Sequence, residues 1–172
     1  MKKLFSIIAL MLFCVAFGQT DAIYKHNGEV VKGKVLRLDE FTITFVYEGE
    51  EAENKLTKYA VAKIVYKSGR TEEITDKIVI NSEKDWEKVI ILEDITYSAG
   101  LKRVDEVRGK TGLINFQTGN TGDKKAEKKL KMDAAAMGCP FVLLTADKAT
   151  VGANSNQLGG QQVIKKGVAY RY

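Results

Sequence analysis

Short apolar and β-branched runs alternate with polar turns through the first half of the chain. The alternation is clearest in Thr42-Ile43-Thr44-Phe45-Val46-Tyr47. Asn27-Gly28 predicts a hairpin with a type I′ turn, which needs positive φ at both central residues. Strands are predicted at residues 30–38, 42–47, 59–66 and 72–74. About five strands in residues 22–75 are typical of a small antiparallel barrel or a curled sheet.

Two turns of this half have similar sequences. Tyr24-Lys25-His26-Asn27-Gly28 resembles Tyr66-Lys67-Ser68-Gly69. Two hairpins with the same turn chemistry account for this, and an internal repeat is the alternative. The stretch from Asn27-Gly28 to Gly33-Lys34-Val35 resembles the opening of small all-β modules at the start of many exported proteins of the Bacteroidetes type. This resemblance implies a fold rather than an activity.

A polar stretch at residues 76–85 is the predicted junction between two modules. Ile78-Val79-Ile80 is expected to finish the first module, and Trp86 precedes a new apolar run at residues 89–92. We therefore divide the chain into an all-β module at residues 19–80 and an α+β domain at residues 81–172. Since no proline- or glycine-rich linker separates them, we expect the modules to pack against each other.

The second half mixes strand and helix patterns. A helix is predicted at residues 124–137, with Thr121 or Asp123 as N-cap and Gly138 at the C′ position. Its apolar face consists of Ala126, Leu130, Ala134 and Met137. Strands are expected at residues 101–107, 141–146 and 168–172, and a flexible loop or hairpin tip at residues 152–162. The predicted fold class is α+β: a small antiparallel β-barrel-like module, then an α/β module with one main helix packed on a sheet.

The second half also resembles a known family in the order of its elements. A glycine-led strand at residues 100–109 precedes a helix that stops at Ala136-Met137-Gly138. An apolar strand from Phe141 follows at once, and the last strand contains Gly167-Val168-Ala169-Tyr170. Over residues 97–172 this pattern is similar to the small α/β envelope domains of the Rcs stress-sensor lipoprotein and related uncharacterised bacterial lipoproteins. The resemblance implies the fold. The sensor's domain is braced by disulfides, and Tyr172 stands where relatives often carry a cysteine, so the sensing role does not carry over residue by residue.

The N-terminus has the pattern of a secretory signal peptide at residues 1–18. Lys2 and Lys3 form a positive start, residues 4–17 are apolar apart from Ser6, and Ala16-Phe17-Gly18 supplies the small residues of a cleavage site before Gln19. The apolar run of about 14 residues is shorter than the roughly 20 that span a bilayer as a helix. We therefore expect a periplasmic or secreted protein with no transmembrane segment after cleavage.

Cleavage also changes the charge and the cysteine content. The formal net charge is +5 for the whole chain, and the loss of Lys2 and Lys3 leaves a mild basic balance that predicts no nucleic-acid partner. Cys14 follows the bulky Phe13, whereas lipid attachment needs a small residue there, so we interpret Cys14 as part of the signal. Cys139 then has no partner for an internal disulfide and is expected to be a small buried hydrophobe.

Residues for catalysis or metal binding are sparse. Nucleophilic catalysis needs a Cys or Ser beside a His and a carboxylate. The only histidine, His26, is expected to be a solvent-exposed turn residue, in a different module from Cys139. An acidic run lacks the alternating pattern of a calcium loop and predicts a solvated turn; it consists of Glu48, Glu50, Glu51 and Glu53. We therefore expect no metal and no cofactor.

Three short motifs are candidates for a catalytic or phosphate-binding site, but the spacing of their residues favours neither kind of site. Asp105-Glu106 and Glu93-Asp94 are adjacent carboxylates predicted in strands, where neighbours point to opposite faces. Gly109-Lys110-Thr111 ends like a phosphate-binding loop, but that loop needs a glycine where Val104 stands.

Lysines on the predicted helix are the candidate partner-binding site: Lys124, Lys125, Lys128, Lys129 and Lys131. Such a surface suits anionic lipid, glycan or an acidic envelope protein, and a solvated helix face is the alternative. The sequence thus favours a non-enzymatic binding or scaffolding protein of the bacterial cell envelope, with envelope sensing through a protein partner as a further hypothesis. The alternative function is a periplasmic hydrolase whose site lies between the modules.

Overall fold

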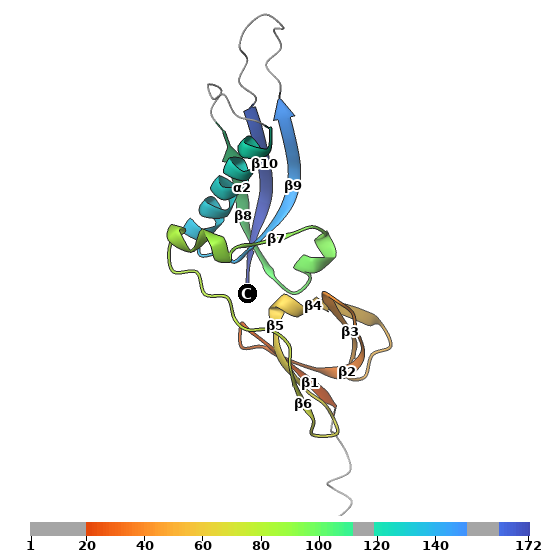
Figure 1. Cartoon of the computed structure of the whole chain (residues 1–172). Coiled ribbons are helices and arrows are strands. Elements are labelled where there is room, and N and C mark those ends of the chain that lie inside the picture. The colour runs from red at the N-terminus through yellow and green to blue at the C-terminus, as the bar shows by residue number, and fades with distance from the viewer. Residues whose placement is uncertain (1–19, 112–118, 151–161) are drawn as a thin grey trace, which may run out of the picture.

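The computed structural model describes residues 20–111, 119–150 and 162–172. The predicted signal peptide, including Cys14, lies outside these ranges, as does nearly all of the predicted hairpin tip. Within them, two sheets and one long helix form an α+β fold (Figure 1). The broad fold class expected from the sequence is therefore confirmed.

Six antiparallel strands form the first sheet, in the order β4-β3-β2-β1-β5-β6. A short 3-10 helix, η1 (Lys58–Ala60), lies between β4 and β5. The strands are β1 Asp21–Lys25, β2 Val30–Leu38, β3 Thr42–Tyr47, β4 Glu53–Thr57, β5 Val61–Val65 and β6 Thr71–Glu73. β2 and β3 match their predicted ranges, whereas β4 is absent from the predicted strands.

The first sheet is curled rather than closed. β4 and β6 lie at its two edges, and no ladder of hydrogen bonds joins them. The expected barrel-like module is wrong in this respect, and the curled sheet is the form observed. Register shifts after Tyr24 and after Val35 bend the sheet locally. Its core consists of Ile23, Ile43, Phe45, Leu56, Val61 and Ile64.

The two similar turn sequences form the same loop. At the first, the N–H of Gly28 donates to the Lys25 carbonyl at 3.0 Å, and the N–H of Lys25 donates to the Glu29 carbonyl at 2.9 Å. The corresponding bonds at residues 66–70 are both 2.8 Å. Only the glycines have positive φ, 94° at Gly28 and 84° at Gly69. This is a three-residue hairpin loop with glycine last, so the type I′ prediction is wrong, while shared turn chemistry explains the repeated sequence.

The second sheet has four strands in the order β7-β9-β10-β8. β7 runs parallel to β9, and the other neighbours are antiparallel. The elements are η2 Glu83–Lys88, β7 Ile90–Leu92, η3 Ile95–Ser98, β8 Lys102–Lys110, α2 Gly119–Ala136, β9 Phe141–Thr150 and β10 Gln162–Arg171. β8, β9 and β10 are longer than predicted, and β9 pairs with β10 as the predicted hairpin requires.

α2 covers one face of the second sheet (Figure 1). Ala126, Leu130 and Ala134 are fully buried, in agreement with the predicted apolar face. Gly109 of β8 allows the helix to approach, because a Cβ atom there would lie 1.8 Å from the Ala126 carbonyl oxygen. Small residues on both sides therefore bring the helix backbone close to the strand.

The ends of α2 agree only in part with the prediction. At the C-terminal end, Gly138 has φ of 67° and its N–H donates to the Ala135 carbonyl at 2.9 Å, as expected for a C′ glycine. The helix begins at Gly119, so Thr121 and Asp123 lie within it and do not cap it.

The connection between the sheets contributes to the core of the second half. Ile78-Val79-Ile80, which was expected to finish the first module, forms no strand. Ile78 packs among the aromatic residues between the sheets, and Ile80 packs against the core under α2. The division of the chain at residue 80 stays a prediction.

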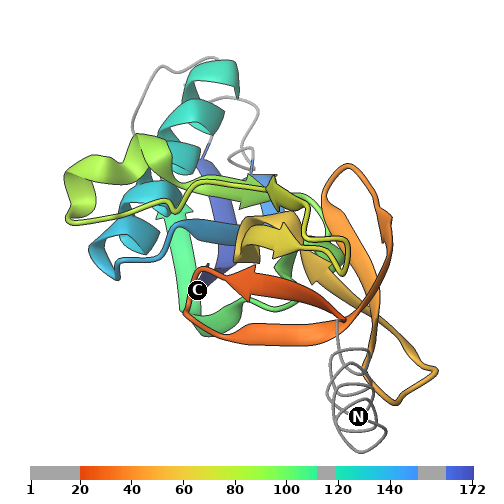
Figure 2. The same cartoon turned by 90° about the horizontal axis from the view of Figure 1, so that it is seen from below.

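Aromatic side chains fill the junction between the two sheets. Phe141 is fully buried, and the rings of Tyr59 and Tyr172 each lie 5.4 Å from its ring, measured between centroids. The backbone also connects the halves, because the N–H of Thr57 donates to the Ala99 carbonyl at 2.8 Å. The halves thus pack against each other as expected, and the C-terminus lies where they meet (Figures 1 and 2).

Candidate functional site

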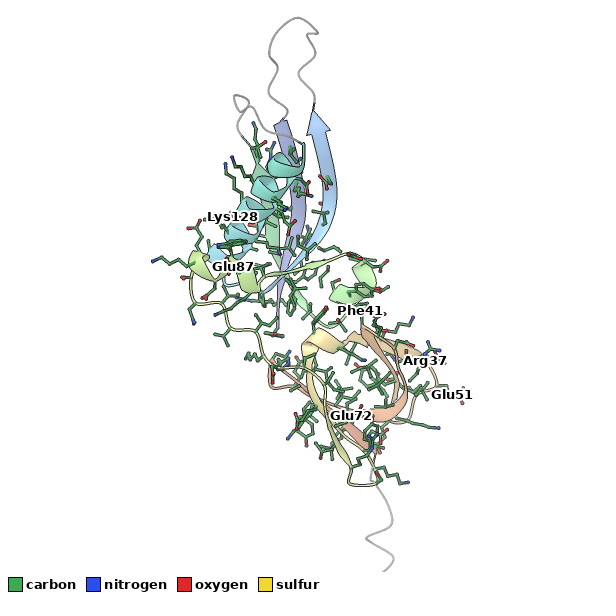
Figure 3. All side chains as sticks on the ribbon, in the orientation of Figure 1. Arg37, Phe41, Glu51, Glu72, Glu87 and Lys128 are labelled. Carbon is green, nitrogen blue, oxygen red and sulfur yellow. The ribbon has the colours of Figure 1, made fainter. Side chains whose placement is uncertain are left out.

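Two of the five candidate lysines on α2 are held by other elements. The Nζ of Lys128 lies 4.7 Å from the centroid of the Trp86 ring, over its face. The Nζ of Lys129 donates to the Lys110 carbonyl at 3.0 Å. Figure 3 shows Lys128 on the side of α2 next to η2. These contacts give both lysines a role within the molecule.

A third lysine pairs along the helix, and two remain without an ion pair. Lys131 and Glu127 form an i,i+4 ion pair at 3.1 Å. Lys124 and Lys125 are exposed, and neither forms an ion pair within the described ranges. The structure therefore narrows the candidate lysines that are open to a partner to this pair, one turn after the start of α2.

Positive charge is divided unevenly along the chain. Residues 20–80 contain ten Lys and Arg against eleven Asp and Glu, whereas residues 81–172 contain fifteen against eleven. Twelve of those fifteen cations lie on α2, β8 and β10. A concentration of one sign attracts partners of the other sign and speeds their association.

A buried lysine that was not among the residues predicted from the sequence joins α2 to the sheet. Lys165 is only 6% exposed, and its Nζ lies 2.8 Å from Asp123 Oδ1 and 2.6 Å from Asp147 Oδ2. Burial by itself lowers the pKa of a lysine, but the two carboxylates outweigh it and raise the pKa of Lys165. The protonated, paired amine is therefore suited to fixing α2 rather than to accepting a proton. The strand register, which places Asp147 opposite Lys165, is the signal that could have revealed it.

His26 is partly buried, which corrects the expectation of an exposed turn residue. Its Nε2 lies 3.0 Å from Thr75 Oγ1, and its ring packs edge-on against Tyr172 at 4.9 Å between centroids. The Thr75 hydroxyl also lies 3.1 Å from the Lys58 carbonyl oxygen and 2.9 Å from that of Val61, so it can donate to a carbonyl while it accepts from Nε2. Burial, followed by the charge of Lys77, lowers the pKa of His26.

The polar groups at the junction connect segments of the chain. The Tyr172 hydroxyl accepts a hydrogen bond from the Ile78 N–H at 2.9 Å, and burial raises the pKa of Tyr172. The Nζ of Lys77 donates to the His26 carbonyl at 3.1 Å. Across the described residues, no three His, Cys, Asp or Glu side chains gather closely enough to hold a metal ion.

Cys139 lies in the core beneath α2. It is 0% exposed, and its Sγ lies 3.6 Å from the Met137 carbonyl oxygen. Burial raises the pKa of the thiol, and a buried thiol of raised pKa is a poor nucleophile. The predicted small buried hydrophobe is confirmed.

The remaining motifs lie on the surface or in the packing. The acidic run at residues 48–53 is exposed in the hairpin of β3 and β4, as expected of a solvated turn. Asp94 accepts a hydrogen bond from the Thr96 N–H at 2.7 Å and caps η3, so Glu93-Asp94 does not lie in a strand as predicted. Asp105-Glu106 and Gly109-Lys110 lie within β8.

Comparisons with known proteins identify no family. Neither a protein-family model nor a curated protein matches the chain. No helix in the described part is long and apolar enough to cross a membrane. The resemblances to the Rcs sensor domain and to Bacteroidetes modules stay hypotheses.

Proposed function

We propose that this protein is an exported, non-enzymatic binding or scaffolding protein of the bacterial cell envelope. The observation that carries the proposal is the concentration of positive charge on α2, β8 and β10. Lys124 and Lys125 are its open pair on α2, and the partner is an acidic envelope protein or an anionic surface. The N-terminal pattern at residues 1–18 supports a periplasmic or secreted location.

The position of this pair supports a binding role. Lys124 and Lys125 lie beyond the first turn of α2, where the helix dipole acts weakly, and neither forms an ion pair within the described ranges. Ala126 and Leu130 on the inner face already anchor α2. The charges of Lys124 and Lys125 therefore add contact or solubility rather than stability. If the partner that binds this pair is an envelope protein, the same contact could link the protein to envelope sensing.

Affinity capture from an envelope extract tests this function. The immobilised protein is compared with the Lys124→Glu/Lys125→Glu variant, at about 0.1 M salt, where surface charges still act over about 10 Å. The matched control is Lys55→Glu/Lys67→Glu, which reverses two exposed lysines of the first sheet that form no ion pair within the described ranges. We expect the wild type and the control to enrich the same component and the helix variant to lose it.

Two outcomes would contradict the proposal. Equal capture by all three proteins removes the lysine pair from any binding role. Sustained turnover of ester, phosphate or glycoside substrates by the purified protein, undiminished in the helix variant, would favour the periplasmic hydrolase instead.

A further inference from the structure

α2 covers one face of the second sheet (Figure 1), and among the described residues no other helix packs on β8 or β10. Val107 belongs to the core under α2. Because successive side chains of a strand point to opposite faces, Arg108 and Lys110 of β8 lie on the face away from α2. Lys166 of β10 lies directly opposite Arg108 in the register. All three cations are exposed. We call Arg108, Lys110 and Lys166 the basic face.

One acidic side chain shares this side of the sheet, because Glu106 lies two residues before Arg108 on β8 and therefore alternates to the same face. Glu106 lies 3.9 Å from Arg103, and none of the three cations of the basic face forms an ion pair within the described residues. Like charges directly opposite each other on neighbouring strands are destabilising, as with Arg108 and Lys166. These three cations are therefore available to a negatively charged surface of another molecule.

The hairpin of β3 and β4 presents the opposite charge. Glu48, Glu50, Glu51 and Glu53, which we call the acidic tip, are all exposed and form no ion pair within the described ranges. Lys32 is the cation beside them: the Glu48 N–H reaches the Lys32 carbonyl at 3.4 Å, but the Lys32 amine pairs with none of the four. No ion pair within the described ranges therefore neutralises the carboxylates of the acidic tip.

The acidic tip and the basic face lie at different ends of the molecule and cannot meet within one chain. Figure 3 shows Glu51 at the outer side of the first sheet, while Figure 1 shows β8 and β10 extending away from it. We propose that the acidic tip of one copy docks on the basic face of a second copy, head to tail. This contact brings four carboxylates to three cations and relieves the repulsion between Arg108 and Lys166.

The geometry decides what kind of assembly results. A head-to-tail contact is heterologous, so each added copy leaves one tip and one face free at the ends. A hairpin tip is narrow, and a contact well below about 1,000 Å² is weak and transient. We therefore expect short, reversible chains that lengthen with concentration and dissociate in salt. This association needs no envelope component, so it stands or falls separately from the function proposed above.

Sedimentation velocity of the purified protein tests the contact. The comparison is between about 0.01 M and about 1 M salt, where charges are screened beyond about 30 Å and about 3 Å. We expect concentration-dependent association at low salt and a monomer at high salt. Glu50→Lys/Glu51→Lys, in the tip, and Arg108→Glu/Lys166→Glu, in the face, should each stay monomeric alone. A mixture of the two variants should associate, because one retains a native face and the other a native tip.

A control and a swap make the result specific to these surfaces. Lys67→Glu/Lys84→Glu reverses two exposed lysines outside them and should associate like the wild type. The fourfold variant with both surfaces reversed should regain association. A monomer at all salt concentrations, association that salt leaves unchanged, or loss in the face variant but not the tip variant would overturn the proposal. Binding of the wild type to phosphatidylglycerol vesicles without self-association would assign the basic face to an anionic lipid surface instead.

Discussion

Single polar residues join segments of this chain that lie far apart in sequence. His26 contacts Thr75, 49 residues away, and Lys165 contacts Asp147, 18 residues away. Both lie within turns or strands whose local sequence gives no indication of a partner. The contribution of His26 and Lys165 to the stability of the fold therefore depends on the protonation state of each side chain.

Replacing His26 by glutamine should flatten the pH dependence of stability. The unfolded chain binds a proton near the ordinary histidine pKa of 6.5, whereas the folded protein binds it only at lower pH, because burial and then the charge of Lys77 lower the pKa of His26. The free energy of unfolding of the wild type should therefore hold its value above pH 6.5 and fall as the pH decreases below it. Glutamine keeps a donor for Thr75 but does not titrate.

Urea unfolding between about pH 7 and about pH 5, the range in which histidine titrates, measures this effect. The charge of Asp76 opposes the shift without reversing it. Loss of stability in parallel in both proteins over this range would show that His26 does not contribute to it.

Residues whose role is set by close neighbours were predicted well. Gly138 and Cys139 are examples, because a helix stop and a buried apolar strand follow from adjacent residues. The exposed position expected for His26 was wrong, since Tyr172 and Thr75 reach it only after folding. The candidate lysines were placed on the correct helix, but their contacts with Trp86 and Lys110 depend on tertiary structure.

At the scale of elements, α2 lies close against β8 at Gly109. Replacing Gly109 by alanine should destabilise the protein by about 1–3 kcal/mol, the usual range for overpacking. The added Cβ would lie 1.8 Å from the Ala126 carbonyl oxygen and 2.8 Å from the Leu130 nitrogen. Both atoms belong to the helix backbone, so the whole helix must shift.

Thermal unfolding followed by circular dichroism measures this loss. Lys110→Ala, at the next position of the same strand but on the other face, is the control and should change stability by no more than about 0.5 kcal/mol. Equal stability of the Gly109→Ala variant and the wild type would mean that α2 can move away from the sheet without lowering the free energy of unfolding.

Strands were predicted correctly where apolar and polar residues alternate regularly. They were missed where polar residues occupy most positions of the strand. β3 alternates and was predicted to the residue, whereas β4 reads Glu53-Asn54-Lys55-Leu56-Thr57 and buries only its last two positions. The start of α2 was misplaced because Gly119 to Gly122 contains good capping residues inside the helix. Closure of the first sheet was not readable either, since it depends on whether β4 and β6 reach each other.

At the scale of the whole molecule, the aromatic junction couples the unfolding of the two halves. Replacing Tyr172 by alanine removes the ring between His26 and Phe141 and leaves the partly buried Ile78 N–H without its acceptor. We expect a loss of about 2 kcal/mol or more. We also expect the two halves to unfold separately.

Trp86 is the single tryptophan and lies against α2, so its fluorescence reports on the second half, while circular dichroism reports on both. The two signals should share one urea midpoint in the wild type and differ in Tyr172→Ala. Tyr172→Phe keeps the ring, should lose about 1 kcal/mol and should keep the midpoints together. Coincident midpoints in the alanine variant would show that the halves are coupled by other contacts.

The side chains of α2 also determine how this molecule can meet others. Asp133 Oδ2 accepts a hydrogen bond from the Arg108 N–H at 3.0 Å, and the Nζ of Lys129 donates one to the Lys110 carbonyl. Both backbone groups lie on the outer edge of β8, where a free strand would otherwise invite another chain to extend the sheet. With these positions occupied by the helix, strand addition at that end of β8 is blocked. Copies of the protein that meet at this end of β8 through the exposed charges of the basic face would therefore form a reversible contact rather than a continuous sheet.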